Sequence, residues 1–231
     1  MNSIFTRVIR FYQAKGIASL LAGISAHLHI YSCSTYYVYK TRYPKDNLLF
    51  SPPKINNLAF EIPTTTAQLE DLLNRGYDFG SNIRDAKRKL KNGAVGFLIF
   101  VNKELAATYW TALNEKAKRT IDPQPYRVDF ANHEACDGGA WTNPKYRRLG
   151  LNSYLNQKLS QYYNEKGIKS TRGIILVSNV ASLTAHEKNH PDDHTPRAIG
   201  RYLVLCGIPF WKEKPATVTD YSKSQGKKWG N

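Results

Sequence analysis

A short apolar run in the middle of the chain, Ala94–Val101, most strongly limits the fold that this sequence can adopt. A continuous apolar segment of this length fits a buried β-strand better than a helix, because helices generally need about ten residues or more. Asn102-Lys103 then provides a tight turn into Leu105–Leu113, so the two segments predict a β-hairpin. A second strongly apolar strand is predicted at Gly173–Val177. The chain must therefore be built around a β-sheet with buried strands.

Helical segments alternate with these strands. Apolar residues recur at helical spacing from Leu151 to Tyr162, and Gly167 provides a C-terminal stop. A basic helix is predicted at 83–90, and another at Asn179–Lys188. The alternation predicts an α+β (α/β) fold. Further strands are predicted at 36–43, 58–62, within 126–142, at 201–206 and at 209–211, with a capped helix at 64–73. Gly138-Gly139 indicates a bulge or a close backbone approach.

Composition indicates a folded protein of a reducing compartment. The 231 residues are 42% hydrophobic, which is enough for a sizeable core. The three cysteines, Cys33, Cys136 and Cys206, have no CxxC spacing, so we expect no disulfide framework and a cytoplasmic location. We expect no transmembrane helix, because no apolar run reaches about 18 residues. The uncharged stretch Gly16–Tyr31 lacks a clear cleavage site, so secretion is not favoured.

The charge balance points to an anionic partner without choosing one. Lys and Arg number 33 against 18 Asp and Glu, a net charge of +15. Such an excess suits nucleic acid, anionic lipid or a phosphorylated ligand. With fifteen tyrosines beside Trp141, Trp211 and Trp229, a basic module that binds nucleic acid or lipid head groups is one hypothesis. Nucleic acid is the weaker expectation, because the sequence has no signature of a nucleic-acid-binding fold.

The chain divides into three parts. Residues 1–50 form a basic extension in which Ile4–Tyr12 predicts an amphipathic helix and Tyr36–Tyr43 a strand. Through residues 1–30 this extension would either contact an anionic membrane or pack on the protein's own core. The boundary is predicted at Ser51-Pro52-Pro53, where the regular α/β pattern begins. Residues 51–215 are the main domain, and 216–231 a basic tail.

The segment Thr142–Asn152 has the features of a phosphate-binding turn. It connects a predicted strand to the helix that begins near Leu151, and Gly150 permits tight backbone there. A helix N-terminus offers unpaired N–H groups and a positive dipole end to a pyrophosphate. Arg147 and Arg148 add guanidinium groups, which match phosphate geometry. The alternative is an ordinary strand–helix turn that happens to be basic.

This turn resembles the cofactor motif of the GNAT acyltransferases. In that family Arg/Gln-x-x-Gly-x-Gly/Ala begins three residues after a proline, and here Pro144 is followed by Arg147, Gly150 and Asn152. Asn152 departs from the Gly or Ala of the family. A second segment keeps the family's register: the apolar strand ends near Asn179, Ser182 follows, and His186 stands where the family has a tyrosine.

The resemblance covers roughly residues 57–211 and implies a GNAT-like mixed, mostly antiparallel central sheet flanked by helices. It implies direct transfer of an acyl group from acetyl-CoA, or another acyl-CoA, to a small-molecule amine, for which the basic surface suggests an anionic acceptor. The thioester would lie where the strand before Pro144 splays from its neighbour. The implied cofactor-binding residues are Trp141, Thr142, Arg147, Arg148, Leu149, Gly150, Leu151, Asn152, Asn179 and Ser182.

The catalytic groups are less determined. A general base would project from the strand before Pro144, where Glu134 is the first choice and Asp129 and Asp137 are rivals. His186 would protonate the departing CoA thiolate, since an imidazole can do so near neutral pH. The other interpretation makes His186 a polar helix residue with no role in proton transfer.

The residues 186–190 also match the zinc-protease pattern H-E-x-x-H, and His194 offers a third nitrogen. Against this hypothesis, Pro191 ends the helix directly after His190, and Met1 is the one methionine, so no Met-turn can form. We therefore predict no metal.

Overall fold

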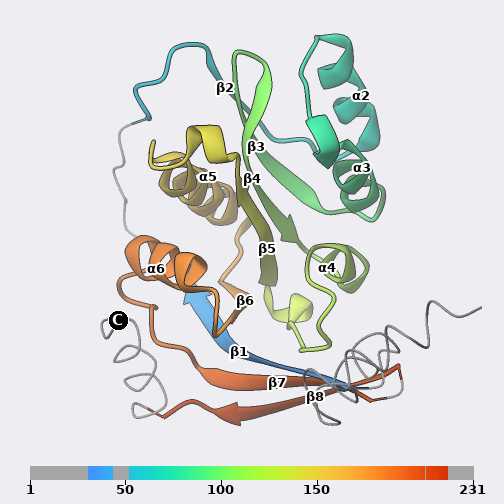
Figure 1. The fold of residues 1–231 in the computed structure, drawn as a ribbon, viewed down its shortest axis with the longest axis vertical. Helices are drawn as coiled ribbons and strands as arrows, with labels where there is room; N and C mark the ends of the chain where they lie inside the picture. Colours follow the sequence, from blue (N-terminus) through green and yellow to red (C-terminus); the bar gives the residue numbers. More distant parts are fainter. Residues whose placement is uncertain (1–30, 44–51, 206, 218–231) are drawn as a thin grey trace, which may run out of the picture.

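The computed structural model describes residues 31–43, 52–205 and 207–217, and within these ranges the strands form one mixed sheet. The strand order is β2-β3-β4-β5-β6-β1-β7-β8, and every neighbouring pair is antiparallel except β5 and β6 (Figure 1). The predicted mixed, mostly antiparallel sheet flanked by helices is thus confirmed. The strands are β1 Tyr31–Arg42, β2 Leu58–Glu61, β3 Val95–Val101, β4 Glu104–Ala112, β5 Glu134–Thr142, β6 Ser170–Leu176, β7 Ala198–Leu205 and β8 Ile208–Pro215.

Helices cover both faces of the sheet. The helices α2, α3 and α4 lie on one side, and α5 and α6 on the other (Figure 1). None of the helices in the described ranges is both long and apolar enough to cross a membrane. The α-helices are α2 Thr66–Asn74, α3 Ile83–Lys91, α4 Glu115–Ile121, α5 Leu151–Lys166 and α6 Val180–Asn189, and the short 3-10 turns are η1 Gly80–Asn82, η2 Phe130–Asn132 and η3 Pro144–Tyr146.

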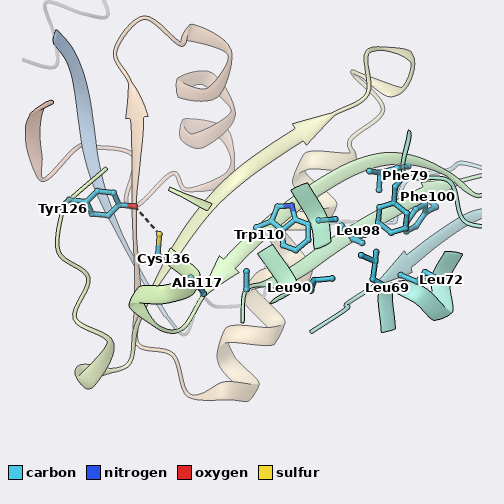
Figure 2. Packing of buried hydrophobic residues seen from close by; sticks show 14 residues of the cluster. Leu69, Leu72, Phe79, Leu90, Leu98, Phe100, Trp110, Ala117, Tyr126 and Cys136 are labelled. Carbon is cyan, nitrogen blue, oxygen red and sulfur yellow. Dashed lines mark hydrogen bonds between the residues drawn. The ribbon is translucent and has the colours of Figure 1, made fainter. Parts of the chain in front are cut away.

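The two-sided cover explains why β3 is apolar throughout. Its side chains alternate between the faces, as in any strand. Leu98 and Phe100 join the core under α2 and α3 (Figure 2), while Phe97 and Ile99 join the core under α5. Each of these four side chains is fully buried. The predicted hairpin is confirmed, because β3 pairs with β4 through the Asn102-Lys103 turn, where both residues have positive φ.

Strand β1 lies inside the sheet and not beside it. Its first part pairs with β7 and its second part with β6, both antiparallel. The strand predicted at 36–43 therefore begins earlier, at Tyr31, and it contributes core residues to the same sheet as the main domain. The helix predicted within residues 1–30, the tail after 217 and the boundary residue Ser51 lie outside the described residues.

Strands β5 and β6 are joined at one end and separate at the other. Their parallel pairing covers Glu134–Cys136 against Ser170–Arg172, although β5 continues to Thr142 and β6 to Leu176. The splay that the family resemblance implied is therefore present before Pro144.

The predicted bulge is also present in β5. The β4–β5 register shifts between Thr108 and Trp110, so that Gly139 and Ala140 have no register partner in β4. Gly139 has a φ of 61°, a left-handed conformation that glycine adopts without a steric cost. A side chain there would also meet the Lys89 ammonium and the Trp110 ring at 3.0 Å. Glycine at position 139 is thus required by both backbone conformation and packing.

Helix α5 is fixed by packing along one face and by glycines at both ends. Gly150 and Gly167 have left-handed φ values of 79° and 66° at its start and end. Between them Leu155 and Tyr163 are fully buried against the sheet.

We expect Leu155→Ala to lower the free energy of unfolding by about 3 kcal/mol, because it leaves a cavity in a well-packed core. Leu205→Ala is the matched control, since Leu205 is 46% exposed at the end of β7. It should change stability by less than about 0.5 kcal/mol. Urea denaturation of both variants measures the difference, and equal losses would contradict the core assignment.

Candidate functional site

A cavity of about 250 Å³ opens where β5 and β6 separate. Strand residues form its floor, including Tyr109 of β4, Asp137 of β5 and Thr171 of β6. The bulge residues Gly139 and Ala140 line it as well. Its other wall comes from the helices, with Asn152 and Asn156 of α5 and Ser182, Ala185, His186, Asn189 and His190 of α6.

The carboxylate in this cavity is Asp137. Its side chain accepts a hydrogen bond from the Tyr163 hydroxyl of α5. The same hydroxyl oxygen lies 2.6 Å from Thr111 Oγ1. Because the phenol has one proton, Tyr163 can donate to only one of Asp137 and Thr111 at a time, and Thr111 Oγ1 itself donates to the Cys136 carbonyl oxygen at 3.2 Å.

Three phenols, two of them buried and one partly buried, lie close enough to this carboxylate to be affected by its charge. Burial, followed by the negative charge of Asp137, raises the pKa of each of them well above its ordinary value. These phenols remain protonated at physiological pH and can act only as neutral hydrogen-bonding groups. They are Tyr43, Tyr109 and Tyr163.

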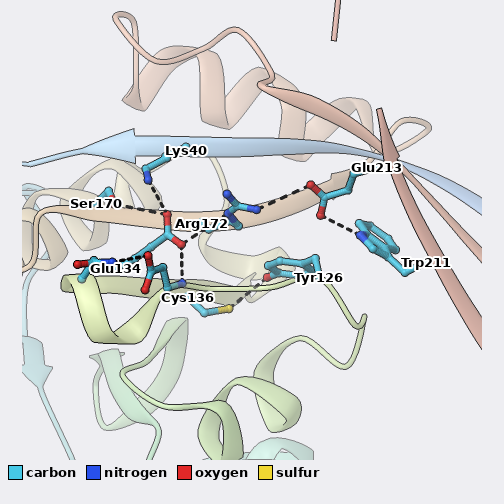
Figure 3. A network of polar contacts seen from close by, with 10 residues as sticks. Lys40, Tyr126, Glu134, Cys136, Ser170, Arg172, Trp211 and Glu213 are labelled. Atoms are coloured by element: carbon cyan, nitrogen blue, oxygen red, sulfur yellow. Dashed lines mark hydrogen bonds and ion pairs between the residues drawn. The ribbon is translucent and has the colours of Figure 1, made fainter. Parts of the chain in front are cut away.

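Glu134, the first choice for a base, lies at the joined end of the two strands. It is 3% exposed, and the Lys40 Nζ of β1 lies 3.0 Å from one carboxylate oxygen. The other oxygen accepts the Asp129 backbone N–H at 2.8 Å and lies 3.6 Å from Arg172 Nε of β6 (Figure 3). Glu134 does not line the cavity at the splay. Its position is that of an ion-paired link between three strands, and its rival Asp137 occupies the cavity instead.

A second cavity, of about 220 Å³, lies at the N-terminus of α5. Arg147, Arg148 and Gly150 of the predicted phosphate turn line it, together with Lys188 of α6. Arg148 and Gly150 have φ values of 63° and 79°, so the turn curls tightly in front of the helix. The site therefore combines the positive end of a helix dipole with cationic side chains.

The two cavities adjoin, because Asn152, Ala185 and Asn189 line both of them. Asn152 is the residue that departs from the family motif. Its Oδ1 accepts hydrogen bonds from Asn156 Nδ2 at 3.0 Å and from Asn189 Nδ2 at 2.7 Å. The amide thus ties α5 to α6, a contact that Gly or Ala could not make.

The remaining predicted cofactor residues take different positions. Asn179 caps α6, where its Oδ1 accepts the Ser182 N–H at 3.1 Å, and it does not line either cavity. Trp141 lines a third cavity, next to α3, and Thr142 lines the cavity at the α5 terminus. Leu149 is 46% exposed in the turn, whereas Leu151, 2% exposed, also packs into the core.

His186 lines the cavity at the splay, opposite the strands. Its Nε2 lies 3.4 Å from the Asp193 carbonyl oxygen, and its ring centre is 4.0 Å from that of Tyr39 in β1. Its ring centre is 4.7 Å from that of His190. The Nδ1 of His194 contacts the Pro191 carbonyl. Across residues 31–43, 52–205 and 207–217, no three His, Cys, Asp or Glu side chains are grouped to hold a metal ion.

Sequence reasoning did not find the aromatic residues of this site. Tyr39 and Tyr109 line the cavity and Tyr163 holds Asp137, yet each lies in a segment that reads as ordinary core. No local pattern separates them from the other tyrosines of the chain. Their roles depend on strand pairing between distant segments.

No protein-family model matches the sequence, and no curated protein matches it. Solved structures of similar fold include a protein from Novosphingobium aromaticivorans assigned to the GNAT acetyltransferases, with 16% identity, 75% of this chain and 65% of that chain covered, and a TM-score of 0.45. A GCN5-related N-acetyltransferase from Kribbella flavida has 15% identity, coverage of 70% and 54%, and a TM-score of 0.38.

A GCN5-related N-acetyltransferase-like protein from Streptococcus suis has 13% identity, coverage of 86% and 68%, and a TM-score of 0.45. This chain spans less than two thirds of the length of the first two structures. The likeness to these three structures concerns the fold alone.

We expect Glu134→Gln to lower the free energy of unfolding by about 3 kcal/mol, because it leaves Lys40 and Arg172 without the buried carboxylate that pairs with them. Glu115→Gln is the control, since Glu115 forms an exposed pair with Arg119. It should cost less than about 1 kcal/mol. Thermal and urea unfolding give both values. An unchanged stability in Glu134→Gln would argue against a structural role for this residue.

Proposed function

We propose that this chain is an acyl-CoA-dependent N-acyltransferase that uses acetyl-CoA or another acyl-CoA as its co-substrate. One observation carries the proposal: the cavity at the β5–β6 splay, which holds a carboxylate, adjoins a basic cavity at the N-terminus of α5. A long ligand with an anionic end and a reactive end fits these two connected cavities. The shared lining residues would contact its middle.

The pyrophosphate of the co-substrate would occupy the cavity at the α5 terminus. The first N–H groups of a helix have no intrahelical partner and point toward such an anion. Arg147, Arg148 and Lys188 would neutralise its charge. Part of the basic excess of the chain is accounted for in this way.

The thioester would lie at the bulge of β5. Gly139 and Ala140 line the splay cavity and stand outside the β4–β5 register. Backbone N–H groups aimed at a carbonyl oxygen stabilise the negative charge that develops there. We place this role at the bulge because Gly139 and Ala140 line the splay cavity, whereas Trp141 and Thr142, implied by the resemblance as cofactor-binding residues, do not.

Asp137 is the proposed general base. The acceptor amine attacks the thioester carbonyl carbon, and its surplus proton passes to the Asp137 carboxylate. The hydrogen bond from Tyr163 fixes the orientation of that carboxylate. When the carbon–sulfur bond breaks, the thiolate takes a proton for which His186, on the facing wall, is the proposed donor.

The acceptor is proposed only as a class, a small-molecule amine, with an anionic group as the feature that the basic surface would favour. Contact of residues 1–30 with an anionic membrane also stays a proposal, since those residues lie outside the described ranges.

Gly150→Trp should abolish binding of acetyl-CoA, because the indole would fill the turn at the start of α5, where a Cβ meets nothing within 4 Å. Isothermal titration calorimetry should give sub-millimolar affinity for the native protein. Gly167→Trp is the matched control, since Gly167 has a similar φ and open surroundings at the other end of the same helix. It should bind acetyl-CoA normally.

If the native protein does not bind acetyl-CoA at sub-millimolar concentration, the acyltransferase proposal is wrong. Salt-dependent binding to oligonucleotides or anionic vesicles would then support the alternative, a basic binding module on this fold.

Asp137→Asn should reduce turnover about 100-fold or more while acetyl-CoA affinity stays within about twofold, because the amide cannot accept the amine proton. Release of free CoA in the presence of a panel of primary amines measures turnover. Asp129→Asn serves as the control, since the Asp129 side chain contacts Asn132 and does not line the cavity. Equal losses in the two variants would remove the role assigned to Asp137.

A further inference from the structure

The side-chain oxygen of Asn189 is buried without a hydrogen-bond partner in the part of the chain that the structure describes. Asn189 is the last residue of α6 and only 4% exposed. A buried amide oxygen with no partner is costly, because water solvates it in the unfolded chain. Such groups are rare in folded proteins and call for an explanation.

The orientation of this amide follows from its neighbour. Asn189 Nδ2 donates to Asn152 Oδ1 at 2.7 Å, and Asn152 Oδ1 also accepts from Asn156 Nδ2. Because the amide nitrogens of Asn156 and Asn189 both donate to this oxygen, it is the oxygen and not the nitrogen of the Asn152 amide that faces Asn189. The amide nitrogen of Asn189 is therefore committed to α5, and its oxygen remains as an acceptor.

The oxygen belongs to a residue that lines both cavities of the proposed site. A phosphate group would not satisfy it, because phosphate oxygens at neutral pH are themselves acceptors. The group that fits must carry an N–H or O–H donor. In an acyl-CoA, the part between the pyrophosphate and the thioester is the pantetheine arm, which has amide N–H groups.

We propose that Asn189 Oδ1 accepts a hydrogen bond from an amide N–H of the pantetheine arm, with Asn152 holding the Asn189 amide in place. This assignment rests on the proposed function. It also gives a reason why position 152 departs from the family motif. Asn152, unlike Gly or Ala, has a side chain that can position a ligand contact on α6. Asn189 is thus a binding residue for the co-substrate and Asn152 a positioning residue.

The test compares CoA with its phosphoadenosine diphosphate part, which keeps the pyrophosphate and lacks pantetheine. Calorimetry gives both dissociation constants for each variant. The dissociation constant of the nucleotide part divided by that of CoA is the ratio that measures how much pantetheine contributes to affinity. In Asn189→Leu this ratio should fall about tenfold, while affinity for the nucleotide part stays within about twofold. Thermal unfolding without ligand checks that the variant is folded.

Asn189→Asp is the second variant, because it keeps an acceptor oxygen and loses the donor to Asn152. Its new charge should weaken both ligands alike, and its acceptor loses the contact that positions it, so the ratio should fall by no more than about threefold, less than in Asn189→Leu. The proposal is overturned if Asn189→Leu leaves the ratio unchanged, or if the Leu and Asp variants lower it equally. If the native protein does not bind CoA at all, the proposed function is overturned as well. CoA binding by the native protein therefore distinguishes failure of the Asn189 assignment from failure of the proposed function.

Discussion

The ion pairs of Glu134 hold three strands together at the joined end of β5 and β6, and the site opens beyond this end. Glu134 of β5 contacts Lys40 of β1 and Arg172 of β6, and the last two residues are also register partners. Beyond this point β5 turns away from β6 into its bulge. A buried carboxylate held by two cations is stable only while all three strands are in place. The position of the splay, and with it the cavity, therefore depends on this group.

Helix α5 links the two halves of the site. Its buried face anchors it to the sheet, and its first turn presents free N–H groups in front of a basic turn. Tyr163, nearer its other end, reaches Asp137 at the splay. The Asn152–Asn189 contact then sets α6 against α5 where the two cavities adjoin. One helix thus positions a basic turn, the contact to a carboxylate and part of the wall between them.

The sequence alone could not decide whether Glu134 or Asp137 is the carboxylate that lines the cavity. Both are carboxylates of the same strand, and side chains that differ by an odd number of positions point to opposite faces. Which face meets the cavity depends on the bulge, on the neighbouring strand and on the nearest cations. Lys40 lies far from Glu134 in sequence, so no local pattern indicates that this carboxylate is neutralised and buried. Tyr39 reaches His186 in the same non-local manner.

The sequence by itself determined the elements and the basic, glycine-containing turn before α5. The apolar run of β3, the periodicity of α5 and the glycines at its ends are local signals, because burial and backbone conformation act over a few residues. Arg147 and Gly150 could be placed in that turn for the same reason. The tertiary structure alone decided that β1 enters the middle of the sheet, that Asp137 and not Glu134 lines the cavity, and that the Asn189 side-chain oxygen is buried without a partner among the described residues. These features arise from pairing between distant segments, which no spacing in the sequence encodes.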